Sequence, residues 1–180
     1  AQSAVPGSEE HKVGQLYASF MDTATIESRG VEPIVVLLEQ ALAVSSISAL
    51  LSTLGRLERK GVSGFGALFV DNDPGDPQRY VVFVEQAGLG LPDESYFREE
   101  RFAEVRAAYL SHLERMFSLC GVDEPAERAA RVYRLEEAIA SKHWDNVASR
   151  DSEKTYNLYD WAGFCELSTS EASETLDWEV

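Results

Sequence analysis

Basic residues are scarce in this sequence: Lys and Arg number 16 against 31 Asp and Glu, so the formal net charge is -15. Nucleic-acid binding depends largely on cationic contacts with phosphate, and anionic membrane surfaces repel an acidic protein. The composition therefore argues against a nucleic-acid partner and against a membrane-surface role. It favours a solvated acidic surface, although such acidity could also line a chamber that attracts cationic peptides.

Apolar runs long enough to cross a membrane are missing, and so is a recognisable signal peptide. Residues 1–7 contain neither the charged segment nor the apolar segment that directs export. The first residue is not Met, so we expect the chain to start inside a longer gene product. The compartment stays open between a cytoplasmic protein and one exported without a visible signal.

Cysteine is nearly absent, since only Cys120 and Cys165 occur. Two residues so far apart fit no metal-binding spacing and form no disulfide framework. They could pair with each other. Each, however, ends an apolar patch (residues 116–120 and 161–165), which favours buried free thiols.

Histidine is also sparse, and His11, His112 and His143 stand far apart. None has a second histidine three or four residues away, and no H-E-x-x-H motif occurs. Zinc sites on helices need that spacing because it places two ligands on one face. We interpret all three as helix-surface or partly packed residues.

Other catalytic patterns are missing as well. The glycines of 64–66 and 88–90 lack the third glycine of a nucleotide-binding loop, and Ser63 does not lie in a nucleophile elbow. Adjacent acids on a helix diverge, so we interpret three acidic pairs as solvated helix faces: Glu9-Glu10, Glu99-Glu100 and Glu136-Glu137. The residues therefore indicate no catalytic, cofactor-binding or metal-binding position in this chain.

Helical periodicity fills most of the sequence. Ser8, followed by two acidic residues, is typical of a helix N-terminus, and Gly30 offers a stop. Pro33 stands where a second helix could begin, and Gly61 closes a third. The last long helix could extend to Trp144. Apolar residues at helical spacing place the predicted helices at about residues 8–30, 33–42, 46–60, 98–119, 124–139, 158–167 and 171–178.

One stretch between the helices has a different pattern. Gly64–Val70 and Arg79–Gln86 are rich in Phe, Val and Tyr, and residues 71–77 between them are a dense cluster of turn formers. This arrangement predicts an antiparallel β-hairpin.

The segment after the hairpin, Q-A-G-L-G-L-P-D-E-S-Y-F at residues 86–97, combines flexible glycines with a fixed proline. Glycine allows close backbone approach or positive φ, Pro92 sets its own φ, and Asp93 can cap the helix that follows. The segment therefore predicts a tight, ordered connection from strand to helix.

This segment resembles the G-L-G-L-P-x-x-x-Y-[YF] signature of the neprilysin family of zinc metallopeptidases. Residues 16–33 resemble the family's helix with the I-[DE]-x-x-G-x-x-P pattern, and the hairpin resembles its paired strands. Residues 135–140, followed by 154–158, are similar to its L-E-x-x-[IL]-A helix and Y-N motif. Four matches in the same order, from about Lys12 onward, make the resemblance specific.

The expected fold is mainly α with an inserted antiparallel β-hairpin, and the resemblance implies that it is part of a larger two-lobed metallopeptidase. Residues 1–180 would be a single region of the family's N-terminal peptidase domain. Its expected parts are a leading segment (1–11), helices (12–62), the hairpin and Gly-Leu-Gly-Leu-Pro turn (63–97) and further helices (98–180).

The family's H-E-x-x-H helix, its E-x-x-x-D glutamate ligand, its N-A-[YF] strand and its transition-state histidine all lie C-terminal to the matched region. The resemblance therefore implies zinc as the cofactor of the full-length parent and none in this chain. It implies two partners, the remaining C-terminal catalytic region and peptide substrates. This stretch is expected to form the cap lobe that encloses the substrate chamber, and to be inactive alone.

The sequence departs from the mammalian members in ways typical of a bacterial member that folds without disulfides. Phe20 stands where they have a cysteine, no N-x-[ST] sequon occurs, and Cys120 and Cys165 do not reproduce the family's pairs. The main alternative is a stand-alone helical protein-interaction module without enzymatic activity. A self-contained hydrolase ranks last, because no nucleophile or metal set supports it.

Overall fold

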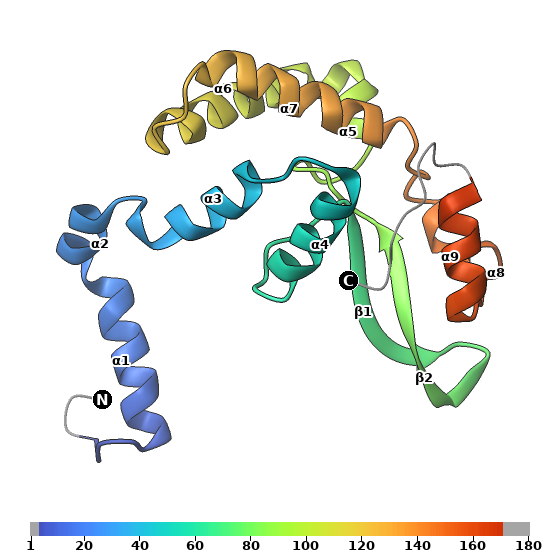
Figure 1. Ribbon diagram of the computed structural model, residues 1–180, viewed down its shortest axis with the longest axis horizontal. Coiled ribbons are helices and arrows are strands. Elements are labelled where there is room, and N and C mark those ends of the chain that lie inside the picture. Colours follow the sequence, from blue (N-terminus) through green and yellow to red (C-terminus); the bar gives the residue numbers. More distant parts are fainter. Residues whose placement is uncertain (1–3, 171–180) are drawn as a thin grey trace. The chain divides into compact units, whose positions relative to one another are not determined.

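The computed structural model describes residues 4–170. The chain divides into two compact units, Ala1–Glu39 and Gln40–Val180 (Figure 1). Within residues 4–170, every helix is too short or too polar to be a transmembrane span.

The first unit is a series of short helices: α1 (Glu9–Met21), α2 (Thr23–Arg29) and η1 (Glu32–Ile34), followed by α3 (Val35–Leu42), which continues into the second unit. Ser8 begins α1 as predicted, because its hydroxyl accepts a hydrogen bond from the His11 N–H at 3.2 Å. Gly30 ends α2 with a φ of 51°, also as predicted.

The prediction of one uninterrupted helix from Ser8 to Gly30 was wrong. Asp22 breaks it, because its carboxylate accepts bonds from the Thr25 N–H at 3.1 Å and the Thr25 hydroxyl at 2.8 Å. A short acidic side chain that satisfies the backbone in this way favours a new helix start over continuation. The same bonds lower the pKa of Asp22, with the Thr25 hydroxyl as the larger cause.

The second unit contains a two-stranded sheet and the remaining helices. Its helices are α4 (Ile47–Glu58), α5 (Ser95–Arg98), η2 (Glu100–Phe102), α6 (Ala103–Leu119), α7 (Pro125–Ala140), η3 (Ala148–Arg150), α8 (Ser152–Thr155) and α9 (Trp161–Ser170). Helices α6 and α7 pack side by side (Figure 1). The predicted helix at 171–178 lies outside the described residues.

The predicted hairpin is present, with longer strands than expected. Strands β1 (Gly66–Asp73) and β2 (Asp76–Gln86) are antiparallel, and Phe69 lies opposite Phe83 in the register. The turn formers at 71–73 and 76–77 belong to the strands, and the side chains of Asn72 and Asp73 bond across the hairpin end. The Asn72 side-chain amide, for example, donates to the Pro77 carbonyl at 2.9 Å.

Two other helix predictions need correction. A continuous helix from Arg98 to Leu119 is interrupted, because Glu99 is extended and the Arg106 guanidinium donates to the carbonyls of Tyr96 (3.0 Å) and Glu99 (2.7 Å). Helix α7 ends at Ala140, so Trp144 lies in the following loop and not on the helix.

The prediction of a buried free thiol is correct in part for Cys120, which is a free thiol at the C-terminal cap of α6 but is only half-buried. Cys165 is likewise half-buried, within α9.

Candidate functional site

The Gly-Leu-Gly-Leu-Pro turn packs tightly against the residues that precede β1. Gly88 has a φ of 88°, and a Cβ at this position would lie 2.7 Å from the Phe65 Cα. The neighbouring Ala87 N–H donates to the Phe65 carbonyl at 3.1 Å. Glycine is needed here both for the backbone conformation and for the close approach.

Gly90 is needed for a different reason, because its φ is not positive. A Cβ there would overlap the Tyr109 hydroxyl and lie 2.7 Å from the Tyr109 Cζ. That hydroxyl donates to the Glu136 carboxylate at 2.9 Å, and the Gly90 N–H donates to Glu136 Oε2 at 3.2 Å. Glu136 on α7 therefore holds the turn and α6 together.

Burial, and then the neighbouring Glu136 carboxylate, raise the pKa of Tyr109 well above its ordinary value. The phenol therefore stays protonated at neutral pH and acts as a hydrogen-bond donor. A phenol that stays protonated offers no ionised oxygen to act as a base or a nucleophile. The Tyr109–Glu136 pair is consequently a structural anchor.

The interpretation of Glu136-Glu137 as a solvated pair was therefore wrong for Glu136. Glu137 is exposed, as predicted, whereas Glu136 is half-buried and bonded to two distant segments. No local pattern distinguishes the two residues. The glycine-rich turn was the only sign in the sequence of a close contact here, since a glycine can mark a position where another residue approaches the backbone.

The adjacent glutamates provide a matched test of this anchor. We expect Glu136→Ala to lower the free energy of unfolding by about 1–2 kcal/mol, because a charged acceptor of two hydrogen bonds is lost. Glu137→Ala should change it by less than about 0.5 kcal/mol. Urea unfolding of both variants measures the difference, and equal stabilities would contradict the anchoring role.

The contacts among Gly90, Tyr109 and Glu136 form a hub around the turn. Apolar packing and further hydrogen bonds surround this hub. Leu91 and Phe97 are buried together with Ala140. Asp93 was predicted to cap the following helix; the N-cap residue is Glu94, but the Asp93 carboxylate accepts from the N–H of Ser95, the first residue of the helix, at 2.9 Å. Its other oxygen accepts from the Asn146 side chain at 2.7 Å. The pKa of Asp93 is lowered, mainly by the Ser95 hydroxyl.

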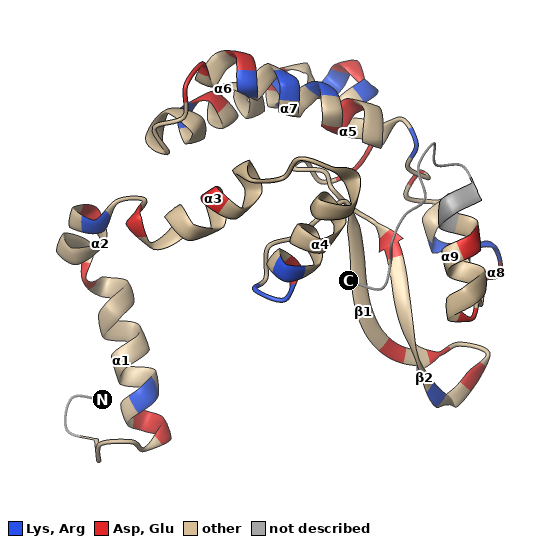
Figure 2. Ribbon diagram, in the orientation of Figure 1, with Lys and Arg blue, Asp and Glu red and all other residues tan. Residues whose placement is uncertain are grey.

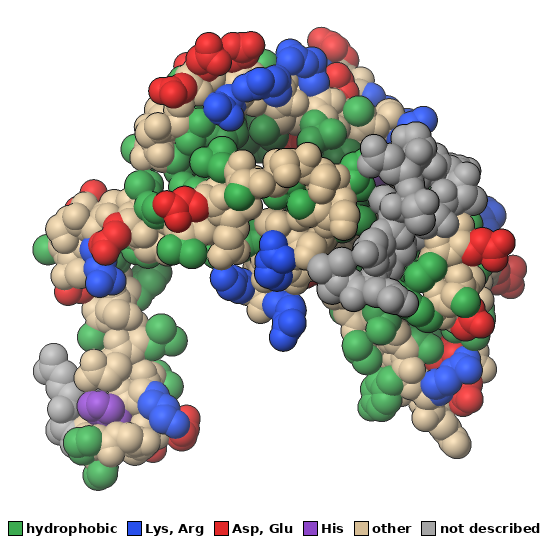
Figure 3. All heavy atoms as spheres, viewed as in Figure 1, with side chains coloured by type: hydrophobic (Ala, Val, Ile, Leu, Met, Phe, Trp, Pro, Cys, Tyr) green, Lys and Arg blue, Asp and Glu red, His purple; other side chains and the backbone are tan. Residues whose placement is uncertain are grey.

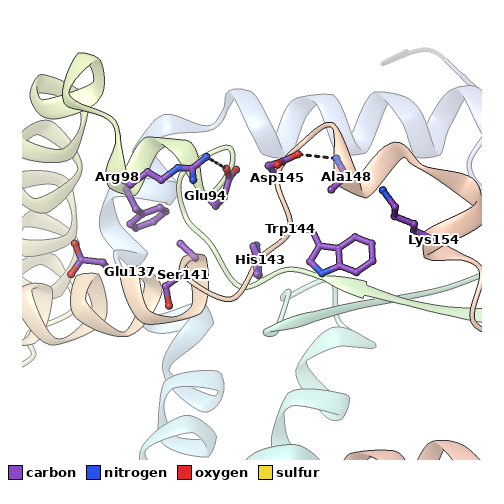
Figure 4. Close-up of a pocket in the computed structure, with 11 residues that line it drawn as sticks. Glu94, Arg98, Glu137, Ser141, His143, Trp144, Asp145, Ala148 and Lys154 are labelled. Carbon is purple, nitrogen blue, oxygen red and sulfur yellow. Dashed lines mark hydrogen bonds and ion pairs between the residues drawn. The ribbon is translucent and has the colours of Figure 1, made fainter.

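Beside the hub lies a hollow of about 850 Å³, shown in Figure 4. Glu94 is buried and forms an ion pair at 2.8 Å with Arg98, which also lines the hollow. His143 and Trp144 come from the loop after α7. The Gln86 side chain fixes this loop, because it donates to the Trp144 carbonyl and accepts from the Trp144 N–H, both at 2.9 Å.

Two polar side chains of the hollow, those of Ser141 and Asp145, are engaged in local structure. The Ser141 hydroxyl donates to the Ala138 carbonyl at 2.6 Å. Asp145 accepts from the backbone N–H groups of Val147 and Ala148 at 2.8 Å, and these bonds, Ala148 first, lower its pKa. Among the side chains that line the hollow, no hydrogen bond joins a nucleophile to a base.

The structure places the three histidines on separate elements: His11 on α1, His112 on α6 and His143 in the loop beside the hollow. Within residues 4–170, no three His, Cys, Asp or Glu side chains gather as a metal site requires. The described residues therefore do not fit a zinc ion, which takes three or four such ligands.

A second cluster closes the hairpin end. Asp73 is fully buried and accepts from Arg79 Nε at 3.0 Å, from the Tyr156 hydroxyl at 2.8 Å and from the Gly75 N–H at 2.7 Å. Tyr156 belongs to the Y-N motif and lies 83 residues after Asp73 in the sequence. The motif therefore ties the segment after α8 to the hairpin.

Hydrogen bonding to Arg79 lowers the pKa of Asp73 to about 2. A carboxyl whose pKa is depressed in the folded state stabilises the fold fully above its ordinary pKa and loses that contribution as the pH falls toward the folded value. We therefore expect the stability difference between the wild type and Asp73→Asn to be constant above about pH 5 and to shrink between about pH 4 and pH 2.

Thermal unfolding across that pH range measures the effect. Asp71→Asn, on the same strand but at an exposed position, is the matched control and should cost little. A wild-type advantage over Asp73→Asn that persists unchanged at pH 2 would contradict this assignment.

Comparison with known proteins agrees with this architecture. A model of the N-terminal region of peptidase family M13 matches residues 1–179. The crystal structure of the Mycobacterium tuberculosis zinc metalloprotease Zmp1 with an inhibitor is 38% identical, with a TM-score of 0.88 over 98% of this chain and 27% of that chain. Its open state, determined by cryo-electron microscopy, gives a TM-score of 0.86.

Curated animal proteins match at lower identity. Endothelin-converting enzyme-like 1 of Rattus norvegicus is 29% identical over 84% of this chain and 21% of its own length. Human membrane metallo-endopeptidase-like 1 is 26% identical over 94% of this chain and 24% of its length. The chain spans about a quarter of the length of these relatives, and its higher identity to the mycobacterial protein fits the expected bacterial type.

The fold is thus that of the N-terminal part of a larger metalloprotease, mainly helical with one inserted hairpin. With the family model covering residues 1–179, the chain belongs to peptidase family M13. The neprilysin-family resemblance inferred from the Gly-Leu-Gly-Leu-Pro turn and its companion motifs is confirmed.

Proposed function

We propose that this chain is the N-terminal region of a neprilysin-like zinc metalloendopeptidase, and that it forms the cap lobe over the chamber in which peptides are cleaved. The observation that carries the proposal is the match to Zmp1, which spans 98% of this chain but 27% of that zinc metalloprotease. Residues 1–180 would then be one continuous part of the N-terminal peptidase domain.

The hub around Gly90 supports a scaffolding role for this region. It joins the turn after β2 to α6 and α7 through Glu136, and it joins the loop after α7 through Asp93 and Gln86. A substrate chamber needs rigid walls, because loosely held walls cannot limit substrate size or exclude water. The residues of this chain would supply those walls and no proton transfer.

The described residues lack a zinc donor set, so we place the metal in the remaining, C-terminal region of the parent. When bound there, zinc would polarise the peptide carbonyl and activate water. Peptides and that C-terminal region are accordingly the proposed partners of this chain.

The test begins by extending the reading frame beyond Val180. We expect the extension to encode an H-E-x-x-H and a downstream E-x-x-x-D, and the purified longer protein to hydrolyse peptides until a chelator is added. Replacing the glutamate of the H-E-x-x-H by glutamine should abolish hydrolysis, because the general base is lost. A stop codon near Val180 would overturn the proposal and favour a stand-alone interaction module.

A further inference from the structure

The middle of the hairpin is apolar on both of its faces. Side chains alternate along a strand, and residues directly opposite each other share a face. The register pairs Leu68 with Val84 and Val70 with Val82, and Tyr80 lies further along the same face. These five residues, Leu68, Val70, Tyr80, Val82 and Val84, are called the hairpin outer face.

The opposite face is also apolar, but it is partly covered. Phe69 stacks on Phe83 with ring centroids 5.1 Å apart, and Val81 and Phe83 are half-buried. In contrast, the side chains of the hairpin outer face are between 52% and 70% exposed. Apolar side chains gather along the hairpin in Figure 3, and its charged residues lie toward the strand ends in Figure 2.

An antiparallel sheet with one solvated face normally alternates apolar and polar residues, whereas a sheet covered on both faces is continuously apolar. The runs A-L-F-V in β1 and Y-V-V-F-V in β2 follow the second pattern. Exposed contiguous apolar surface of this kind marks an interaction site. The hairpin outer face therefore requires a partner that covers it.

We propose that the hairpin outer face is the docking surface for the part of the parent polypeptide that lies beyond the family region matched here. This inference rests on the proposed function. The 38%-identical Zmp1 chain contains nearly four times as much polypeptide as the matched region, so a large intramolecular partner is at hand.

Charge favours that occupant over the others. A second copy of a chain with a net charge of -15, or an anionic membrane, would be repelled. The outer face itself carries no charged side chain, so the surface that covers it must be apolar.

Thiol labelling of the longer protein tests the docking directly. V82C is introduced into a C120S/C165S background, both in the 180-residue chain and in the longer protein. We expect the introduced thiol to react with a maleimide roughly tenfold more slowly, or slower still, in the longer protein, because burial limits access. V147C is the matched control: Val147 is 83% exposed in a loop, and its thiol should react at the same rate in both proteins.

A charge-pair variant provides a second readout. V70K/V82E places opposite charges directly across the strands, so the two strands should still pair. The charged face, however, cannot dock against an apolar surface. The far-ultraviolet circular dichroism of the 180-residue chain should be unchanged, while the longer protein should melt at a lower temperature.

The outcomes separate this inference from the proposed function, which is judged by peptide hydrolysis. A V82C thiol that reacts equally fast in an active longer protein would overturn the docking surface alone. If V82C is already protected in the 180-residue chain and the protection rises with protein concentration, a second copy is the occupant. If anionic vesicles protect V82C, the occupant is a membrane. Either result would overturn the proposal.

Discussion

Gly90→Val is expected to lower the free energy of unfolding by about 3 kcal/mol, among the largest effects of any single substitution in this chain. The new Cβ would overlap the Tyr109 hydroxyl, which is fixed by Glu136 and cannot move aside without losing its hydrogen bond. The Gly90 N–H would also be displaced from Glu136. Urea unfolding followed by circular dichroism measures the change.

Gly55 supplies the matched control, since a Cβ there meets no atom within 4 Å. Gly90→Ala should destabilise the protein, whereas Gly55→Ala, within α4, should stabilise it by up to about 1 kcal/mol because alanine is the better helix former. Tyr109→Phe in the Gly90→Ala background should restore part of the loss. Gly90→Val with wild-type stability would show that the turn is not held as described.

The second large effect concerns metal. We expect the purified 180-residue chain to retain far less than one zinc ion per molecule after dialysis, and the longer protein to retain one. Tight zinc binding needs three or four converging imidazole, thiolate or carboxylate ligands, and the described residues bring no such group together. Metal analysis by mass spectrometry provides the measurement, and one-to-one zinc in the short chain would contradict the account.

Features set by neighbouring residues could be predicted from the sequence. The helix starts at Ser8 and Ser46 and the stop at Gly30 follow from capping chemistry within one turn of chain. The hairpin follows from two β-rich runs around a turn cluster. The strand-to-helix role of residues 86–97 follows from the conformational limits of glycine and proline.

Features that depend on distant residues could not be predicted. The break at Glu99 depends on Arg106. The hairpin end depends on Tyr156, and Glu136 differs from Glu137 only because Gly90 and Tyr109 reach it. No periodicity or local propensity records these contacts. The site itself was therefore visible only as a glycine-rich turn without its partners.

The family resemblance extended the prediction beyond local structure. It came from ordered short motifs, and two of them now have a structural reason: Gly90 of the turn leaves room for the Tyr109 hydroxyl, and Tyr156 of the Y-N motif donates to Asp73. These two motifs make structural contacts within the region. This explains how a region can retain a peptidase signature while the chemistry is assigned elsewhere.

Peptide hydrolysis by the purified 180-residue chain, measured with and without a chelator and beside the longer protein, tests the central claim most directly. The account predicts no turnover by the short chain under either condition and chelator-sensitive turnover by the longer protein. Chelator-sensitive cleavage by the short chain, free of any longer species, would contradict it.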